Sequence, residues 1–340
     1  MSTAVTAVSH RIRRLLGLAV IGTSLLSATA CGGRGTSTAA DRLSTSPTTA
    51  PAPTQPIHPP TPTSPTTQPT ATAPSTSEAS ASADERLTAT LDDLVGGAGA
   101  RVHVRCAGSG ASTVILISGY ETGSDAWWAV EPTIAAQTRV CTYDRPGTGT
   151  SEAASAIATF TTQAHDLHNL LTTVGEPGPY VVVGHSFGGA EAVAFASAFP
   201  DQVTGLALVD ASPVTWPDAL CAVPDDGSAA ATMLRDLCAG WSEPTGNAEH
   251  LDVFAAFADV STITSLGSLS MAVITAVDRT LPTGLATDEV ARLTDVWNQG
   301  QQRWSQLSTG SRLVPVDETS HDIQLDHPDV VIDEILRLLP

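Results

Sequence analysis

The chain has 340 residues and a formal net charge of −19, and all 16 of its basic residues are arginines. Such an acidic surface repels phosphate backbones, and we therefore expect no nucleic acid partner. The first eighty or so residues have little to pack, so the length predicts one folded domain of roughly 250 residues.

Residues 1–30 have the organisation of a signal peptide. The basic sequence HRIRR at 10–14 precedes an apolar run at 15–26, which is too short for a comfortable membrane span. The run leads to ATACGG at 28–33, which resembles a bacterial lipoprotein lipobox with Ala28 where Leu is usual. Lipid attachment at Cys31 would anchor the protein at the outer face of the membrane, whereas cleavage after Ala30 would secrete it.

Residues 31–83 are expected to form a disordered linker behind the lipidated cysteine. Ser, Thr, Ala and Pro dominate residues 36–83, which hold ten of the 23 prolines. Such a segment cannot bury enough surface to offset its ordering entropy. We therefore expect a semi-stiff spacer between the membrane and a folded domain at residues 84–340.

Within that domain, short apolar runs alternate with helical patterns. Because such strands are apolar throughout, the alternation predicts a mostly parallel sheet with helices on both faces. Residues 211–270 interrupt the alternation and contain Trp216, Trp241, Phe254 and Phe257, which either line substrate space or form a core of their own. The expected strands are 102–106, 113–117, 139–143, 180–183, 206–209, 271–275 and 311–316, and the helices are 161–174, 190–199 and 330–339.

The sequence GHSFG at 184–188 lies between an apolar strand and a helix of small residues. A serine hydroxyl is a weak nucleophile, so it needs a base within reach and a turn that exposes its oxygen. Glycines on both sides of Ser186 permit such a tight turn, and the helix that follows favours a developing anion. The pattern predicts that Ser186 is a nucleophile.

Three further motifs join this turn: ISGY at 117–120, YDRPGTGTS at 143–151 and SHDI at 320–323. Together the four resemble the α/β-hydrolase superfamily over residues 101–339. The resemblance implies an α/β-hydrolase fold with a sheet of eight strands, and a cap insertion at about 211–270 after strand 6. It also implies that the backbone N–H groups of Tyr120 and Phe187 form an oxyanion hole, although Ser118 stands where His is common.

The same resemblance implies that His321, which follows the last strand, is the general base. His185 adjoins the nucleophile and must point away from it. Two aspartates fit the position of the triad acid: Asp278 after the strand at 271–275, and Asp210 after the strand at 206–209. The sequence leaves both open.

The remaining candidate ligands are histidines and cysteines. His165 and His168 lie at i and i+3 of a helix with no third metal ligand, so we expect them on a solvated helix face. The folded part has four cysteines and no Cys-x-x-Cys pair, which favours two disulfides over zinc. The resemblance implies the pairs Cys106–Cys141 and Cys221–Cys238, because it places the strands of the first two side by side. No metal and no cofactor are expected.

These residues predict a serine hydrolase, of the carboxylesterase or lipase kind, that cleaves a small-molecule ester, or else an amide or thioester. Dehalogenases and epoxide hydrolases of this superfamily require an aspartate where Ser186 stands. The alternative is a surface-bound lipoprotein that has the same fold, lacks catalysis, and binds a ligand or partner.

Overall fold

The computed structural model describes residues 89–96, 99–176, 178–277 and 281–340. The expected signal peptide, Cys31 and the Pro-rich linker lie outside the described residues. Within the described part, no helix is both long and apolar enough to cross a membrane.

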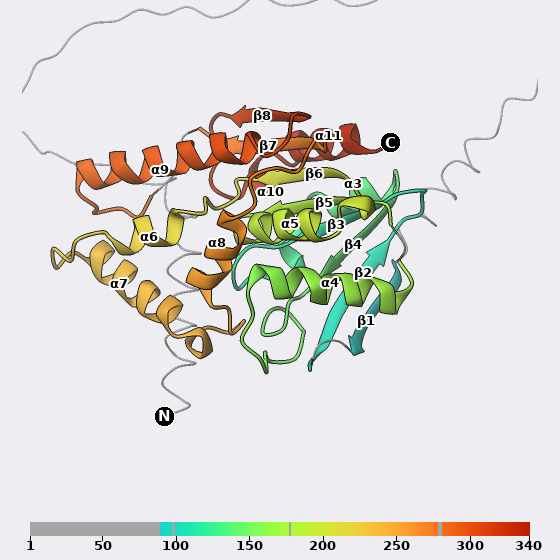
Figure 1. Cartoon of the computed structure of the whole chain (residues 1–340), viewed down its shortest axis with the longest axis horizontal. Coiled ribbons are helices and arrows are strands. Elements are labelled where there is room, and N and C mark those ends of the chain that lie inside the picture. Colours follow the sequence, from blue (N-terminus) through green and yellow to red (C-terminus); the bar gives the residue numbers. More distant parts are fainter. Residues whose placement is uncertain (1–88, 97–98, 177, 278–280) are drawn as a thin grey trace, which may run out of the picture.

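The centre of the fold is an eight-stranded sheet with the order β1-β2-β4-β3-β5-β6-β7-β8 (Figure 1). Strand β2 runs antiparallel to both of its neighbours, and every other pair is parallel. The mostly parallel sheet expected from the sequence is therefore confirmed. The strands are β1 (Ala89–Gly96), β2 (Arg101–Ala107), β3 (Thr113–Ile117), β4 (Arg139–Tyr143), β5 (Tyr180–His185), β6 (Val203–Val209), β7 (Ser270–Ala276) and β8 (Ser311–Val316).

Helices cover both faces of the sheet, which explains why its central strands are apolar throughout. On β5, Val182 faces one buried cluster with α4 and α5, while Val181 and Val183 face a second cluster with α3 and α11. The helices are α3 (Glu131–Ala135), α4 (Phe160–Val174), α5 (Phe187–Ala198), α6 (Trp216–Cys221), α7 (Ala229–Ser242), α8 (Val253–Ser261), α9 (Thr287–Ser305), α10 (Ile323–Asp326) and α11 (Pro328–Leu338).

Helix α4 shows how local sequence sets the ends of an element. Thr159 and Thr162 form a reciprocal capping box at its start, and Gly175 ends it with a φ of 74°, in the left-handed region that favours glycine. Three buried leucines on one side of the helix, Leu167, Leu170 and Leu171, pack against the sheet.

The segment between β6 and β7 holds α6, α7 and α8, which lie to the left of the sheet in Figure 1. We call residues 211–269 the cap. A disulfide between Cys221 and Cys238 joins the end of α6 to α7. Trp216, Trp241 and Phe257 are buried and belong to the same cluster as the sheet residues, so the cap shares the main core.

Among the elements that were not expected from the sequence are β1 and α9, together with α3, α10 and the three helices of the cap. Strand β1 pairs with β2 at the edge of the sheet, where Asp92 and Asp93 make it too polar to read as a strand. Helix α9 buries Leu293, Trp297 and Trp304, whose spacing of four and seven residues is that of one helix face.

Candidate active site

The turn that carries Ser186 joins the end of β5 to the start of α5. Ser186 has φ 54° and ψ −122°, a strained conformation for a residue with a side chain. A Cβ at Gly184 would lie 2.2 Å from the carbonyl oxygen of Gly188, and one at Gly188 would lie 2.3 Å from that of Ser118. Both glycines are therefore needed for this backbone path.

The structure brings His321 to this serine. His321 lies between β8 and α10, and its Nε2 is 2.9 Å from Ser186 Oγ. Its Nδ1 lies 2.6 Å from Oδ2 of Asp210, which directly follows β6. Since a carboxylate only accepts hydrogen bonds, Nδ1 carries the proton and Nε2 is left to accept one from the serine hydroxyl.

Asp210 is completely buried, and donors surround the oxygen that does not face His321. Its Oδ1 accepts hydrogen bonds from the Trp297 indole at 3.0 Å, the Ala276 amide at 3.2 Å and the Thr275 hydroxyl at 3.4 Å. These bonds compensate for the loss of water around a buried carboxylate. Of the two aspartates expected from the sequence, Asp210 contacts His321, while Asp278 lies outside the described residues.

The two amides expected to form an oxyanion hole belong to residues near the serine, since a Cβ at Gly119, which precedes Tyr120, would lie 3.3 Å from Ser186 Cβ, and Phe187 follows Ser186 in the chain. Phe187 is the first residue of α5, and Tyr120 follows β3, with their rings 5.0 Å apart. In the described chain, neither the Tyr120 nor the Phe187 amide donates a hydrogen bond. Both amides are therefore available as donors, as an N–H at a helix start commonly is.

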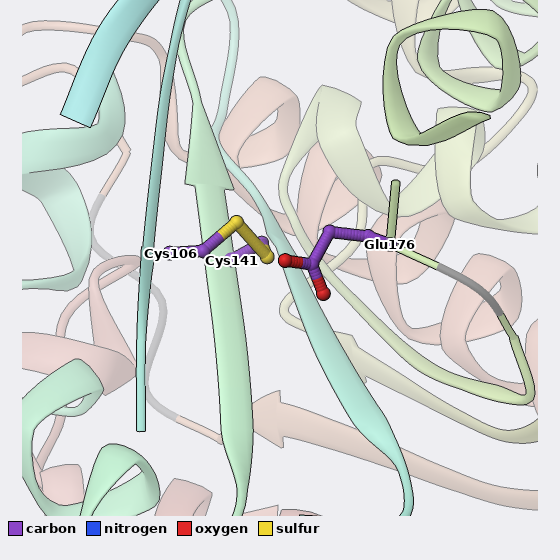
Figure 2. A group of neighbouring side chains, drawn as sticks. All are labelled: Cys106, Cys141 and Glu176. Atoms are coloured by element: carbon purple, nitrogen blue, oxygen red, sulfur yellow. A yellow bond between two sulfur atoms is a disulfide. The ribbon is translucent and has the colours of Figure 1, made fainter. Parts of the chain in front are cut away.

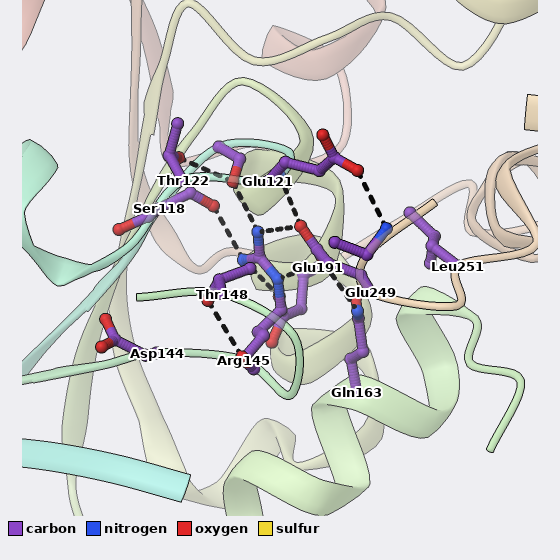
Figure 3. A network of polar contacts seen from close by, with 12 residues as sticks. Ser118, Glu121, Thr122, Asp144, Arg145, Thr148, Gln163, Glu191, Glu249 and Leu251 are labelled. Atoms are coloured by element: carbon purple, nitrogen blue, oxygen red, sulfur yellow. Dashed lines mark hydrogen bonds and ion pairs between the residues drawn. The ribbon is translucent and has the colours of Figure 1, made fainter. Parts of the chain in front are cut away.

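A buried arginine holds the backbone next to Tyr120 (Figure 3). Arg145 Nη1 donates to the Ser118 carbonyl at 2.8 Å, and Nη2 donates to the Gly119 carbonyl at 2.5 Å. Arg145 also pairs with Glu191 of α5 at 3.3 Å and with Glu249 of the cap at 2.7 Å. This role was not predicted from the sequence, although the arginine lies in the motif at 143–151.

The charge balance in this network is unusual, because two buried carboxylates share one guanidinium. Burial raises the pKa of Glu191 to about 7, against the opposing effects of Arg145 and of the Tyr143 hydroxyl that donates to its carboxylate. Burial and the neighbouring Glu191 carboxylate also raise the pKa of Tyr143. Protonation of Glu191 near neutral pH would bring the three-residue group of Arg145, Glu191 and Glu249 to charge balance.

His185 is buried beside the site without taking part in the contact between Ser186 and His321. Its Nε2 donates to the His321 carbonyl at 3.0 Å, and burial together with the charge of His321 lowers its pKa to about 4. It is therefore neutral at pH 7 and supports the backbone of His321.

His165 and His168 pack against Phe199. The His168 ring stacks on Phe199 with centroids 4.0 Å apart, and the His165 ring meets Phe199 edge-on at 5.2 Å. Both side chains were expected on a solvated helix face. His165 is exposed as expected, whereas His168 is half-buried and stacks on Phe199.

Both expected cysteine pairs are bonded, Cys106 with Cys141 and Cys221 with Cys238. Cys106, Cys141 and Glu176 form the one group of potential metal ligands within the described residues (Figure 2). The two sulfurs are joined in the disulfide and Glu176 pairs with Arg139, so this group lacks the thiolates that a metal would need.

Aromatic side chains of the cap pack against Phe187, the residue that follows Ser186. The rings of Trp241 and Phe257 lie 5.6 and 4.9 Å from that of Phe187, and Trp216 meets Trp297 edge-on at 4.8 Å. Since all three cap aromatics are buried, they form packing between the cap and the sheet domain, whereas Phe254 is half-buried.

Comparison with known proteins agrees with this geometry. A family model described as the alpha/beta hydrolase fold matches residues 112–226, which include Ser186 and Asp210. An uncharacterized protein of Schizosaccharomyces pombe is 29% identical over 175 residues, which are 43% of this chain and 31% of that protein. A 2-hydroxy-6-oxononadienedioate/2-hydroxy-6-oxononatrienedioate hydrolase of Paraburkholderia phymatum is 35% identical over 123 residues, 34% of this chain and 42% of the hydrolase.

The chain thus spans less than half the length of these two curated relatives. Among solved structures, the enol-lactonase from Burkholderia xenovorans superposes with a TM-score of 0.53 at 18% identity, over 72% of this chain and 99% of that one. At such identity the likeness concerns the fold. Sheet order, family model and superposition together show that this chain has the α/β-hydrolase fold.

Proposed function

We propose that the protein is a serine hydrolase that cleaves a carboxylic ester through an acyl-enzyme at Ser186. The observation that supports this most directly is the continuous chain of contacts from Ser186 Oγ through His321 to Asp210, at 2.9 and 2.6 Å. These are the distances at which a base can take a proton from a nucleophile while a carboxylate orients the base.

In this mechanism Ser186 Oγ attacks the acyl carbon while His321 Nε2 takes the hydroxyl proton. Asp210 stabilises the imidazolium that forms, and the amides of Tyr120 and Phe187 bind the oxyanion of the tetrahedral intermediate. His321 then gives its proton to the leaving alcohol, and the acyl group stays on Ser186. Water, deprotonated by His321, attacks the acyl-enzyme and releases the acid.

The Paraburkholderia relative is itself named as a hydrolase and supports the reaction class. For the bond that is cleaved, we propose an ester of the carboxylesterase or lipase kind, with amides and thioesters as poorer substrates. A fluorophosphonate probe tests the nucleophile, because it modifies only an activated serine. The wild type should be labelled and Ser186→Ala should not.

An unlabelled wild type would leave the ligand-binding alternative as the better reading of this fold. Once labelling is established, a series of chromogenic esters from acetate to long acyl chains would define the acyl specificity. An amide series with the same acyl groups should be turned over more slowly.

For localisation, we propose that Cys31 is lipidated and holds the enzyme at the outer face of the membrane. The support is the sequence at 28–33, which lies outside the described residues. Full-length protein expressed in its bacterial host should take up radiolabelled palmitate and sediment with membranes. Cys31→Ser should lose both properties, and a soluble, unlabelled wild type would favour secretion.

A further inference from the structure

The turn at residues 118–121 presents the Tyr120 amide, and its backbone conformation decides where that N–H points. Arg145 fixes one side of this turn, because it donates hydrogen bonds to the carbonyls of both Ser118 and Gly119. A trans peptide is planar, so its C=O and N–H point in opposite directions. When the Gly119 carbonyl faces Arg145, the Tyr120 N–H must face away from it.

Glu249 of the cap holds the other side of the same turn. Its Oε1 accepts a hydrogen bond from the Glu121 amide at 2.5 Å. The same carboxylate grips the guanidinium of Arg145 with two bonds, 2.7 Å from Nε to Oε2 and 3.1 Å from Nη2 to Oε1 (Figure 3). Glu249 is only 3% exposed, so these contacts form away from solvent.

The contact between cap and turn is reciprocal. The Ala248 amide donates to the Glu121 carboxylate at 2.9 Å, and Glu121 has a φ of 52°, a conformation that costs energy for a residue with a side chain. Gly147 lies so near the cap that a Cβ there would fall 1.9 Å from the Ala248 carbonyl oxygen. The loop before α8 is thus fitted closely against both sides of the turn.

We propose that Glu249 is a positioning residue through which the cap fixes the oxyanion amide of Tyr120. The role rests on the proposed function, since an oxyanion forms only in acyl transfer. A cap that is correctly seated places Glu249, which aligns Arg145 and the Glu121 amide and thereby the peptide between Gly119 and Tyr120. The cap then contributes to the chemical step as well as to the shape of the site.

The test is the substitution Glu249→Gln, which keeps an acceptor for the Glu121 amide and removes the charge that orients Arg145. Removal of one oxyanion donor costs about 10²–10³-fold in kcat, so a misaligned donor should cost roughly 10- to 100-fold. KM should stay within about twofold, because the oxyanion contact forms only in the transition state.

The matched control is Glu176→Gln, which removes the charge of a half-buried ion pair with Arg139, at the opposite end of the parallel strands. Both variants should unfold at lower temperature, but Glu176→Gln should keep the wild-type kcat. An inhibitor that forms a tetrahedral serine adduct, such as a trifluoromethyl ketone, should lose affinity for Glu249→Gln by about the factor lost in kcat/KM. Equal kcat values for the two variants, or an unchanged inhibitor affinity, would overturn the proposal.

Amide hydrogen exchange of the peptide that covers residues 118–123 gives a readout that does not depend on turnover. Glu249→Gln should speed exchange at this turn relative to the wild type, and Glu176→Gln should not. Should Glu249→Gln not fold, Arg145→Lys offers the same comparison, because lysine keeps the charge and cannot bond two carbonyls and Glu249 together. Failure of the wild type to react with a fluorophosphonate would refute the proposed hydrolase activity. Unchanged amide exchange in the variants would refute only the positioning role of Glu249.

Discussion

Replacement of Asp210 by asparagine should disable the site with almost no change in shape. The pocket around Oδ1 is lined by donors, including the Trp297 indole and the Ala276 amide. An asparagine must therefore place its carbonyl oxygen there, which directs its NH₂ group at His321 Nδ1. The imidazole must then accept at Nδ1 and carry its proton on Nε2, facing the hydroxyl of Ser186.

In that tautomer His321 cannot take the proton of Ser186, which lies 2.9 Å from Nε2. The imidazolium of the transition state also loses its contact with a buried carboxylate, 2.6 Å from Nδ1 in the wild type. In a comparable serine hydrolase triad this change lowers kcat by about 10⁴-fold, so we expect a loss of about 10³–10⁴-fold, or roughly 4–5.4 kcal/mol.

The assay is kcat/KM on a chromogenic ester, with circular dichroism and thermal unfolding to verify the fold. Asp322→Asn is the matched control, since Asp322 adjoins His321 but its carboxylate is partly exposed and 3.6 Å from His185 Nε2. We expect that control and Asp278→Asn to stay within about threefold of wild type. A loss of less than tenfold in Asp210→Asn, or a larger loss in Asp278→Asn, would refute the assignment of the acid.

Three further changes test other parts of the structure. Trp297→Phe removes the indole donor to Asp210, and should lower stability by about 1–3 kcal/mol in urea unfolding and kcat by several-fold. The pKa of Glu191 is raised from 4.5 to about 7, so the stability that its protonated form contributes is present below pH 4.5 and is lost as pH rises through 7. The urea midpoints at pH 5 and pH 8 should therefore differ less in Glu191→Gln than in the wild type. Gly188→Ala forces a Cβ to 2.3 Å from the Ser118 carbonyl oxygen and should cost at least about 2 kcal/mol, whereas unchanged unfolding would contradict the packing of the turn.

The sequence predicted seven of the eight strands, most of them short apolar runs of the kind that a covered parallel sheet buries. The strand expected at 113–117 matches β3, and the one at 139–143 matches β4. Helix α9 was not predicted from the sequence, even though Leu293, Trp297 and Trp304 have helical spacing, because its polar residues outnumber these three. Its omission mattered, since Trp297 touches the proposed triad acid.

Ser186 and His321 could be predicted as nucleophile and base from the sequence because each lies in a local motif between defined elements. The acid could not, since Asp210 and Asp278 both follow a strand and only tertiary contacts distinguish them. Asp210 lies 111 residues from His321 in the chain, and the donors to its carboxylate come from β7 and α9. These donors hold the carboxylate in place beside His321. None of them is near Asp210 in the sequence, so the residues around Asp210 do not reveal them.

The same reasoning applies more strongly to Glu249, which lies 104 residues from Arg145 in a segment without a recognisable motif. A buried carboxylate is costly to remove from water, and it is stable only where hydrogen-bond donors such as the Arg145 guanidinium and the Glu121 amide replace the water. The cap must therefore be seated against the turn before Glu249 can be buried, and in the same position Glu249 holds the turn. Seating of the cap and alignment of the Tyr120 amide are thus one structural event, so changes in cap sequence that preserve substrate contacts but shift Glu249 should lower kcat before they change KM.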